Sequence, residues 1–160
     1  YRIVVMSFSV SRVDWEQAAP ILKNIREKVF ICEWRIPRNI EFDRYDRQAF
    51  HMLVCDDSTQ EPIATGRIMP TGEISRIAVI MNFRDQHIDR VIFNGLIKIA
   101  KELQLNEVFI ISSLEAVDYY RKHNFVASGA VFMEAGIPRQ RMSCRINNLD
   151  IEDTSYLLNH

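Results

Sequence analysis

The stretch that decides the fold reads EISRIAVI at residues 73–80, MNFRD at 81–85 and QHIDRVIFNGLIKIAKEL at 86–103. The first part is rich in β-branched side chains, which predicts a strand. In 86–103, apolar side chains recur every three or four positions, which predicts an amphipathic helix. The apolar run 107–111 predicts a further strand, buried on both faces. These segments predict a parallel β–α–β crossover, and the turn before its helix is a place where such a fold holds a phosphate.

Outside this crossover, the sequence predicts a mixed α/β domain with the order β-α-βββ-α-β-α-ββ. Further strands are expected at residues 1–10, 50–55, 63–69, 126–134 and 140–146. One further helix is expected behind Asp14 and another from Ser112 to about His123, because both starts have the spacing of a capping box. Pro20 is expected to break or kink the first of these helices, and Asn124 to end the second.

Composition narrows the class of protein. A chain of 160 residues with 48% apolar and 26% charged residues fits one globular domain. The formal net charge of −1, from 20 basic and 21 acidic residues, argues against a nucleic-acid or membrane partner. Cys32, Cys55 and Cys144 are dispersed and show no CxxC pair, and the sequence does not begin with a secretory signal. We therefore expect a cytoplasmic protein with reduced thiols.

Several motifs, in order along the chain, carry a resemblance to a known family. They are VFICEWRIP at 29–37, EISRIAV followed by RDQHIDR at 73–90, AVDYYRKHNF at 116–125 and EAGIP at 134–138. Together with Asp43, Asp46 and His51, they resemble the GNAT acyltransferase superfamily, and in particular its ElaA-like branch. The resemblance implies a GNAT-like domain over residues 1–146 and a C-terminal tail over 147–160.

The resemblance also implies an activity: transfer of an acetyl or short acyl group from acetyl-CoA to the primary amine of a small molecule or a protein, by direct attack. The backbone of Ile77, Ala78 and Val79 would pair with the pantetheine arm, and one N–H would polarise the thioester carbonyl. The loop that would hold the pyrophosphate, and Ser112 after the next strand, complete the expected cofactor-binding residues. In the loop they are Arg84, Asp85, Gln86, His87, Ile88, Asp89 and Arg90.

The sequence departs from the family pattern at several positions. His87 and Asp89 replace the loop glycines, so a Cβ and a carboxylate stand where a phosphate would approach. Asn124 replaces a glycine, Trp34 a glutamine and Arg139 a histidine. The pyrophosphate loop is therefore degenerate, and a second hypothesis stays open: a domain that no longer catalyses and serves as a binding or regulatory module.

Tyr120 and Glu33 are the predicted catalytic residues, and Trp34 and His51 are predicted to face the acceptor. Tyr120 would protonate the leaving thiolate. Glu33 would orient the amine or accept its proton through water, and Trp34 would offer a cation–π face to an ammonium group. Each has a structural alternative: packing for Tyr120 and Trp34, an ion pair with Arg35 or Arg38 for Glu33, and a hydrogen-bonded structural role for His51.

The remaining features predict little chemistry. His and Cys spacings show no metal motif, so no metal site is expected. The charged run 41–47 is interpreted as a solvated surface with internal ion pairs. The tail 147–160 has two open interpretations, a link to a further region or a contact in a homodimer.

Overall fold

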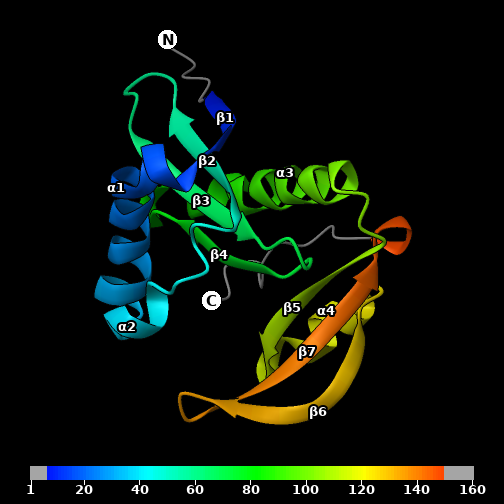
Figure 1. The fold of residues 1–160 in the computed structure, drawn as a ribbon. Helices are drawn as coiled ribbons and strands as arrows, with labels where there is room; N and C mark the ends of the chain where they lie inside the picture. The colour runs from blue at the N-terminus through cyan, green and yellow to red at the C-terminus, as the bar shows by residue number, and fades with distance from the viewer. Residues whose placement is uncertain (1–6, 150–160) are drawn as a thin grey trace.

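Two antiparallel sheets form the framework of the domain (Figure 1). The computed structural model describes residues 7–149, apart from the side chains of Asp85 and Gln86. The first sheet has the order β1-β2-β3-β4 and the second the order β5-β7-β6. The strands of the first are β1 (Phe8–Val13), β2 (Phe50–Asp56), β3 (Pro62–Ile68) and β4 (Ile74–Val79). Those of the second are β5 (Glu107–Ser113), β6 (Val126–Glu134) and β7 (Ile137–Arg145).

Helices cover both faces of the first sheet. α1 (Trp15–Arg26) packs on one face and α3 (Ile88–Glu102) on the other, as Figure 1 shows. α3 lies close to the sheet because a Cβ added at Gly66 would stand 2.4 Å from Ile92 Cγ2, and one at Gly95 would stand 2.8 Å from Met52 Cε. Such distances exclude a larger side chain without a shift of the helix. The short α4 (Val117–Lys122) packs against β6 and β7 of the second sheet.

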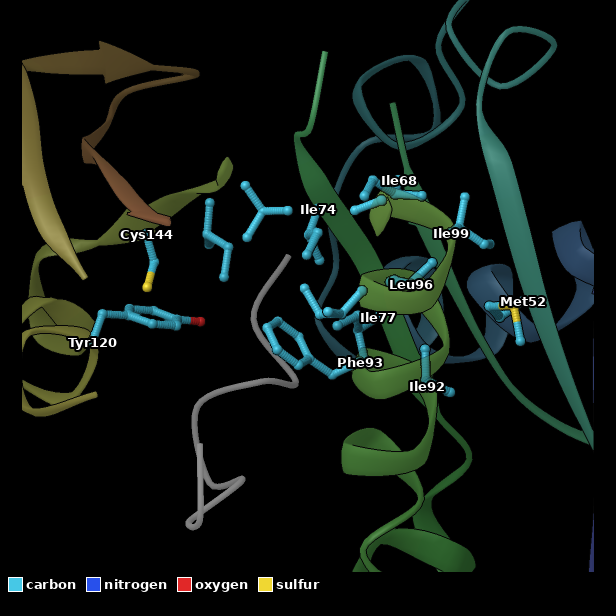
Figure 2. Packing of buried hydrophobic residues seen from close by; sticks show 14 of the residues in the cluster. Met52, Ile68, Ile74, Ile77, Ile92, Phe93, Leu96, Ile99, Tyr120 and Cys144 are labelled. Atoms are coloured by element: carbon cyan, nitrogen blue, oxygen red, sulfur yellow. The ribbon is translucent and has the colours of Figure 1, made fainter. Parts of the chain in front are cut away.

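The main hydrophobic core lies where α3, α4 and the two sheets meet. Figure 2 shows Ile74 and Ile77 of β4 facing the α3 side chains Ile92, Phe93 and Leu96. Tyr120 of α4 belongs to the same cluster, as do Met142 and Cys144 of β7. A smaller cluster, with Leu22 and Ile25 of α1 and Ala78 of β4, fills the other face. β4 is therefore buried on both faces.

β4 and β5 meet only where they begin. The bridge between the sheets in the described chain is the parallel pair Glu73 and Phe109, and the Phe109 N–H donates to the Gly72 carbonyl at 3.0 Å. Beyond this point β4 pairs with β3 and β5 with β7, so the two strands belong to different sheets. The predicted α3 crossover thus joins two parallel strands that diverge.

The predicted element order and fold class are confirmed, but several local predictions are wrong. Neither predicted capping box forms: Asp14 makes no side-chain cap hydrogen bond, and the predicted cap Ser112 lies in β5, its hydroxyl donating to the Ser113 carbonyl. α1 continues through Pro20. Asn124 has the left-handed conformation expected of it, with φ of 71°. Within the first expected strand, residues 1–6 lie outside the described part of the chain, and β1 extends to Val13.

The segment after α1 holds structure that the sequence did not predict. A π-helix, η1 (Glu27–Glu33), continues α1, and the one-turn helix α2 (Arg38–Glu41) follows. The interpretation of 41–47 as a solvated surface is wrong, because Glu41 is 0% and Asp46 2% exposed. Their carboxylates pair with arginines from α1 and the sheet. The alternation of charge along the chain could not show these pairs.

Candidate active site

A β-bulge at Arg76 sets the geometry of β4. Thr65 pairs with Ala78 and Arg67 with Ser75, so β4 has one more residue than β3 between these pairs. Arg76 has a left-handed backbone with φ of 58°, a conformation that is unfavourable for a residue with a Cβ. As a result, the side chains of Ser75 and Arg76 both lie on the α1 side, whereas Ile74 and Ile77 lie on the α3 side. At the bulge, one face of the strand is therefore polar and charged and the other apolar, whereas further along the strand Ala78 packs in the smaller apolar cluster on the α1 side.

The charged face is held by a buried ion network, defined here as Arg26, Glu41, Asp43, Asp46, Arg67 and Arg76. Arg26 Nε lies 2.7 Å from Glu41 Oε1, and its Nη1 lies 2.7 Å from Asp46 Oδ1. Arg67 Nη1 lies 2.9 Å from Asp43 and 3.0 Å from Asp46. Because Arg26 and Asp46 are at most 2% exposed, water screens the charges of these pairs only weakly. The network fixes the segment after α2 to the sheet.

Arg76 and His51 both belong to this buried region. Burial, with the nearby Arg67 charge, lowers the pKa of Arg76 to about 10. Its guanidinium donates to the backbone carbonyls of Ile40 and Glu41. His51 is 1% exposed, its Nε2 lies 2.8 Å from the Asp46 carbonyl, and burial lowers its pKa. The structural alternative for His51 therefore fits the structure, and its predicted contact with the acceptor has no support in this geometry.

A cavity of about 40 Å³ opens between β4 and β5 next to this network. Glu73, at the start of β4, lines it together with Glu134 and Arg139 from the β6–β7 hairpin. Glu73 also lines a second cavity, with Tyr45, Met69 and Pro70. Among the described residues no hydrogen bond or ion pair engages the Glu73 carboxylate. Burial raises its pKa, and repulsion from Glu134 adds to this, against the opposing effect of Arg67 and Arg76.

The loop before α3 has the features of an anion site. It forms a 3₁₀ segment, η2 (Met81–Gln86), and His87 then takes a left-handed conformation with φ of 57°. His87 thus keeps a backbone typical of glycine, the residue expected here in the family. α3 begins at Ile88 without a side-chain cap, which leaves the N–H groups of its first turn available. Arg90 Nε is buried and hydrogen-bonds to no other group. A free helix N-terminus and an unsatisfied guanidinium fit a pyrophosphate.

Arg84, the other predicted phosphate ligand, is already paired. Its Nη1 and Nη2 lie 2.6 and 2.7 Å from the two carboxylate oxygens of Glu33, and its Nε donates to the Val79 carbonyl at 2.9 Å. The expected alternative partners of Glu33 are wrong, since Arg38 pairs with Glu27. The hydrogen bonds from Arg84 lower the pKa of Glu33. A carboxylate held in this way is a poor proton acceptor, which disfavours the catalytic role predicted for Glu33.

Tyr120 lies in the core between the two sheets. It is 1% exposed, and its ring packs against Phe125 with centroids 5.2 Å apart. Figure 2 shows its hydroxyl pointing across the core toward Phe93. Burial raises the pKa of Tyr120, so its hydroxyl stays protonated over the physiological range. A protonated phenol can donate to a leaving thiolate, but Tyr120 lines neither of the two cavities beside Glu73, and its catalytic role stays a prediction.

The other predicted site residues have mixed placements. Ile77, Ala78 and Val79 lie on β4 beyond the bulge, where the strand has parted from β5. Ser112 is buried at the end of β5, and its hydroxyl donates to the Ser113 carbonyl at 2.7 Å. Asp89 is 4% exposed in the first turn of α3. Trp34 packs its ring edge against Phe30 and donates to Glu33, so it borders the loop end of β4, and its contact with the acceptor stays a prediction.

Comparison with known proteins identifies the family. Residues 36–146 match the family described as the acetyltransferase (GNAT) domain. The chain belongs to the GNAT acetyltransferase family. It is 30% identical over 122 residues, 74% of its own length and 86% of the relative's, to the uncharacterized N-acetyltransferase YjcF of Bacillus subtilis.

Solved structures agree on the fold of this GNAT domain. An acyl-CoA N-acyltransferase from Pseudomonas aeruginosa superposes with a TM-score of 0.70 at 22% identity, covering 88% of this chain and 99% of that chain. Escherichia coli ElaA superposes with a TM-score of 0.68 at 16% identity, covering 86% of this chain and 99% of that chain. These similarities show the fold. Proteins of this family use acyl-CoA as their cosubstrate. In the described residues of this GNAT domain, no helix is long and apolar enough to cross a membrane, and no His, Cys, Asp and Glu side chains cluster as metal ligands would.

Sequence reasoning missed Glu73, Glu134 and Arg139 as a group in this GNAT domain. In the sequence, Glu73 and Glu134 stand out only as the first residues of two family motifs, and Arg139 only as a departure from the family pattern. They lie far apart along the chain and meet because β4 and β5 diverge and the β6–β7 hairpin lies across the gap. The available signal was Glu73 itself, a carboxylate at the start of a strand whose next six residues are all buried.

Proposed function

We propose that this GNAT domain is an N-acyltransferase that transfers an acetyl or other short acyl group from acyl-CoA to a primary amine. The observation that carries the proposal is the unpaired, partly buried carboxylate of Glu73 in the gap between β4 and β5. An amine must lose its proton before it can attack a carbonyl carbon, and this requires a nearby base. A carboxylate with a raised pKa is a better base than an ordinary one.

The chain supplies a distinct group for each requirement of the reaction. Acyl-CoA, when bound, supplies the activated acyl group. The first turn of α3 and Arg90 would hold its pyrophosphate, and the unpaired edge of β4 beyond the bulge would bind its pantetheine arm. The Glu73 carboxylate would accept a proton from the acceptor's ammonium group, and the free amine so formed would attack the thioester carbonyl. The Tyr120 hydroxyl would donate a proton to the departing sulfur.

Isothermal titration with acetyl-CoA and with desulfo-CoA, combined with a thiol-release assay over a panel of primary amines, tests this function. We expect both ligands to bind and at least one amine to be acylated. Arg90→Gln should weaken binding about 10-fold or more, because charge-assisted hydrogen bonds to phosphate are lost. Tyr120→Phe should lower turnover about 100-fold with little change in acetyl-CoA affinity, as expected of a contact made only in the transition state.

The second hypothesis, a binding or regulatory module without catalysis, is favoured by one observation. Glu33 neutralises Arg84, which would otherwise be available to the pyrophosphate. Acetyl-CoA binding without turnover on any amine would support this module. Absence of acetyl-CoA binding would overturn both the enzyme and a module that responds to coenzyme A.

A further inference from the structure

The cavity between β4 and β5 is lined by an arginine that forms no ion pair in the described chain. Arg139 lies on β7 and is half-buried, and its Nε is buried without a hydrogen-bond partner. Its neighbour across the hairpin is Phe132, whereas Glu134 pairs in register with Ile137. A buried N–H without a partner is unfavourable. Because Arg139 also lines the cavity, the position points to an anionic group that comes from outside the chain.

The other guanidinium of this cavity is already largely engaged by the protein. Arg76 Nη2 donates to the Ile40 carbonyl at 3.1 Å and to Asp43 Oδ2 at 3.2 Å, and its Nε lies 3.4 Å from Glu41 Oε2. Two of its three nitrogens are therefore held by the buried ion network. Arg139 forms no ion pair with any described residue, so it is the stronger candidate for recognition of an anion in this cavity.

The acidic residues of the cavity restrict what the anion can belong to. Glu73 and Glu134 line the same cavity as Arg139 and Arg76, so an anion bound at Arg139 would also lie near two carboxylates. A zwitterion satisfies both signs, with its ammonium at the carboxylates and its anionic group at the guanidinium. The volume of about 40 Å³ holds roughly three water-sized groups, which is the size of a carboxylate.

We propose that the acyl acceptor is a free amino acid, with its carboxylate bound by Arg139 and its amino group at Glu73. This inference rests on the acyl transfer proposed above and names its acceptor class. The second cavity that Glu73 lines measures about 370 Å³. Besides Glu73, its lining consists of Tyr45, Gln48, Arg67, Met69, Pro70 and Thr71. It would receive the side chain, and Tyr45, Met69 and Pro70 provide apolar surface for an apolar one.

Paired acceptors test the role of the carboxylate directly. The thiol-release assay with acetyl-CoA is run on L-leucine, L-methionine and L-phenylalanine and on the carboxamide of each. We expect kcat/KM to be at least about 10-fold higher for the acids. Arg139→Gln should lower kcat/KM for the acids by about 10- to 100-fold and leave the carboxamides and acetyl-CoA affinity unchanged. Arg139→Lys should restore part of the loss, because it keeps the charge but not the planar fork.

Arg141→Gln is the matched control. Arg141 lies two residues away on the same strand, its Nε is also buried without a partner, and it packs on Phe109 outside the cavity. We expect this variant to keep the preference for acids. Carboxamides used as well as acids, or an equal loss for both acceptors in Arg139→Gln, would overturn the proposal.

A binding measurement separates this inference from the proposed function. Isothermal titration with L-leucine and L-leucinamide, without acetyl-CoA, reports recognition of the carboxylate alone. Binding of the acid but not the amide, lost in Arg139→Gln, supports the site even if no acyl transfer is detected. Equal binding of acid and amide, or binding of neither, overturns the acceptor class, whereas turnover on another amine would leave the acyltransferase function standing.

Discussion

The two faces of β4 differ in charge and in polarity at the bulge. On the α1 side, Ser75 and Arg76 meet a buried ion network, and Glu73 lies beside them at the cavity. On the α3 side, Ile74 and Ile77 pack in the apolar core that contains Tyr120. A regular strand alternates its side chains, and the bulge at Arg76 instead places two neighbours on the charged face. In the function proposed above, the chemistry of the acceptor belongs to the charged face, whereas the apolar face holds the strand against α3.

The largest expected effect follows from breaking the network on the charged face. Arg26→Gln leaves Glu41 and Asp46 buried without their main partner, and removal of one member of a buried pair lowers the free energy of unfolding by about 3–5 kcal/mol. For a domain of this size the Tm should fall by roughly 10 °C, measured by thermal unfolding.

Arg38→Gln provides the control for that variant. Its ion pair with Glu27 is solvent-exposed, with side-chain exposures of 61% and 42%, so its loss should change stability by less than about 1 kcal/mol. If Arg26→Gln were no more destabilised than Arg38→Gln, the network would not be what holds the charged face together.

The next effect concerns proton transfer on the charged face. Glu73→Gln should lower kcat/KM about 100-fold or more and leave acetyl-CoA affinity unchanged. Because the carboxylate must be ionised to accept a proton, and because its pKa is raised above the usual 4.5, activity should fall as pH drops through a value higher than 4.5. The measurement is the pH dependence of kcat/KM, and the acidic limb should vanish in the variant. A limb that persists unchanged would assign the base elsewhere.

The two faces of β4 also differ in how much of their structure can be predicted from the sequence. Much of the apolar face follows from periodicity, since most of the predicted stripe of α3 is buried. Its buried members are Ile88, Ile92, Leu96 and Ile99, whereas Val91 and Leu103 are exposed. The charged face could not be predicted, because its ion pairs join residues such as Arg26, Asp46 and Arg67 that lie 20 or more positions apart. Periodicity reports which residues share a face of one element. It carries no information on which arginine reaches which carboxylate once loops fold over the sheet.

A smaller effect is expected at the ion pair between Glu33 and Arg84, beside the end of β4. Glu33→Gln should free the Arg84 guanidinium and tighten acetyl-CoA binding about two- to fivefold. The effect is modest because the two side chains are about one-quarter exposed, so water screens part of their interaction. Glu27→Gln removes the same charge from the same helical stretch without touching Arg84, so its affinity should match that of the wild type. Weaker binding in Glu33→Gln would mean that the pair supports the loop instead of competing for Arg84.

The smallest expected effect concerns the backbone of the loop before α3, separately from the charge of its side chains. His87 adopts a left-handed conformation with φ of 57°, which is unfavourable with a Cβ, so His87→Gly should stabilise the domain by about 0.5–1 kcal/mol. Removal of the Cβ also lets a phosphate approach the backbone, and acetyl-CoA should bind about twofold more tightly at fixed salt, a difference of about 0.4 kcal/mol. Gln104→Gly is the matched control, because Gln104 has φ of 60° at the other end of α3. Thermal unfolding should show the same gain for both variants, and titration should show tighter acetyl-CoA binding for His87→Gly alone. Equal affinities in the two variants would place the pyrophosphate away from this loop.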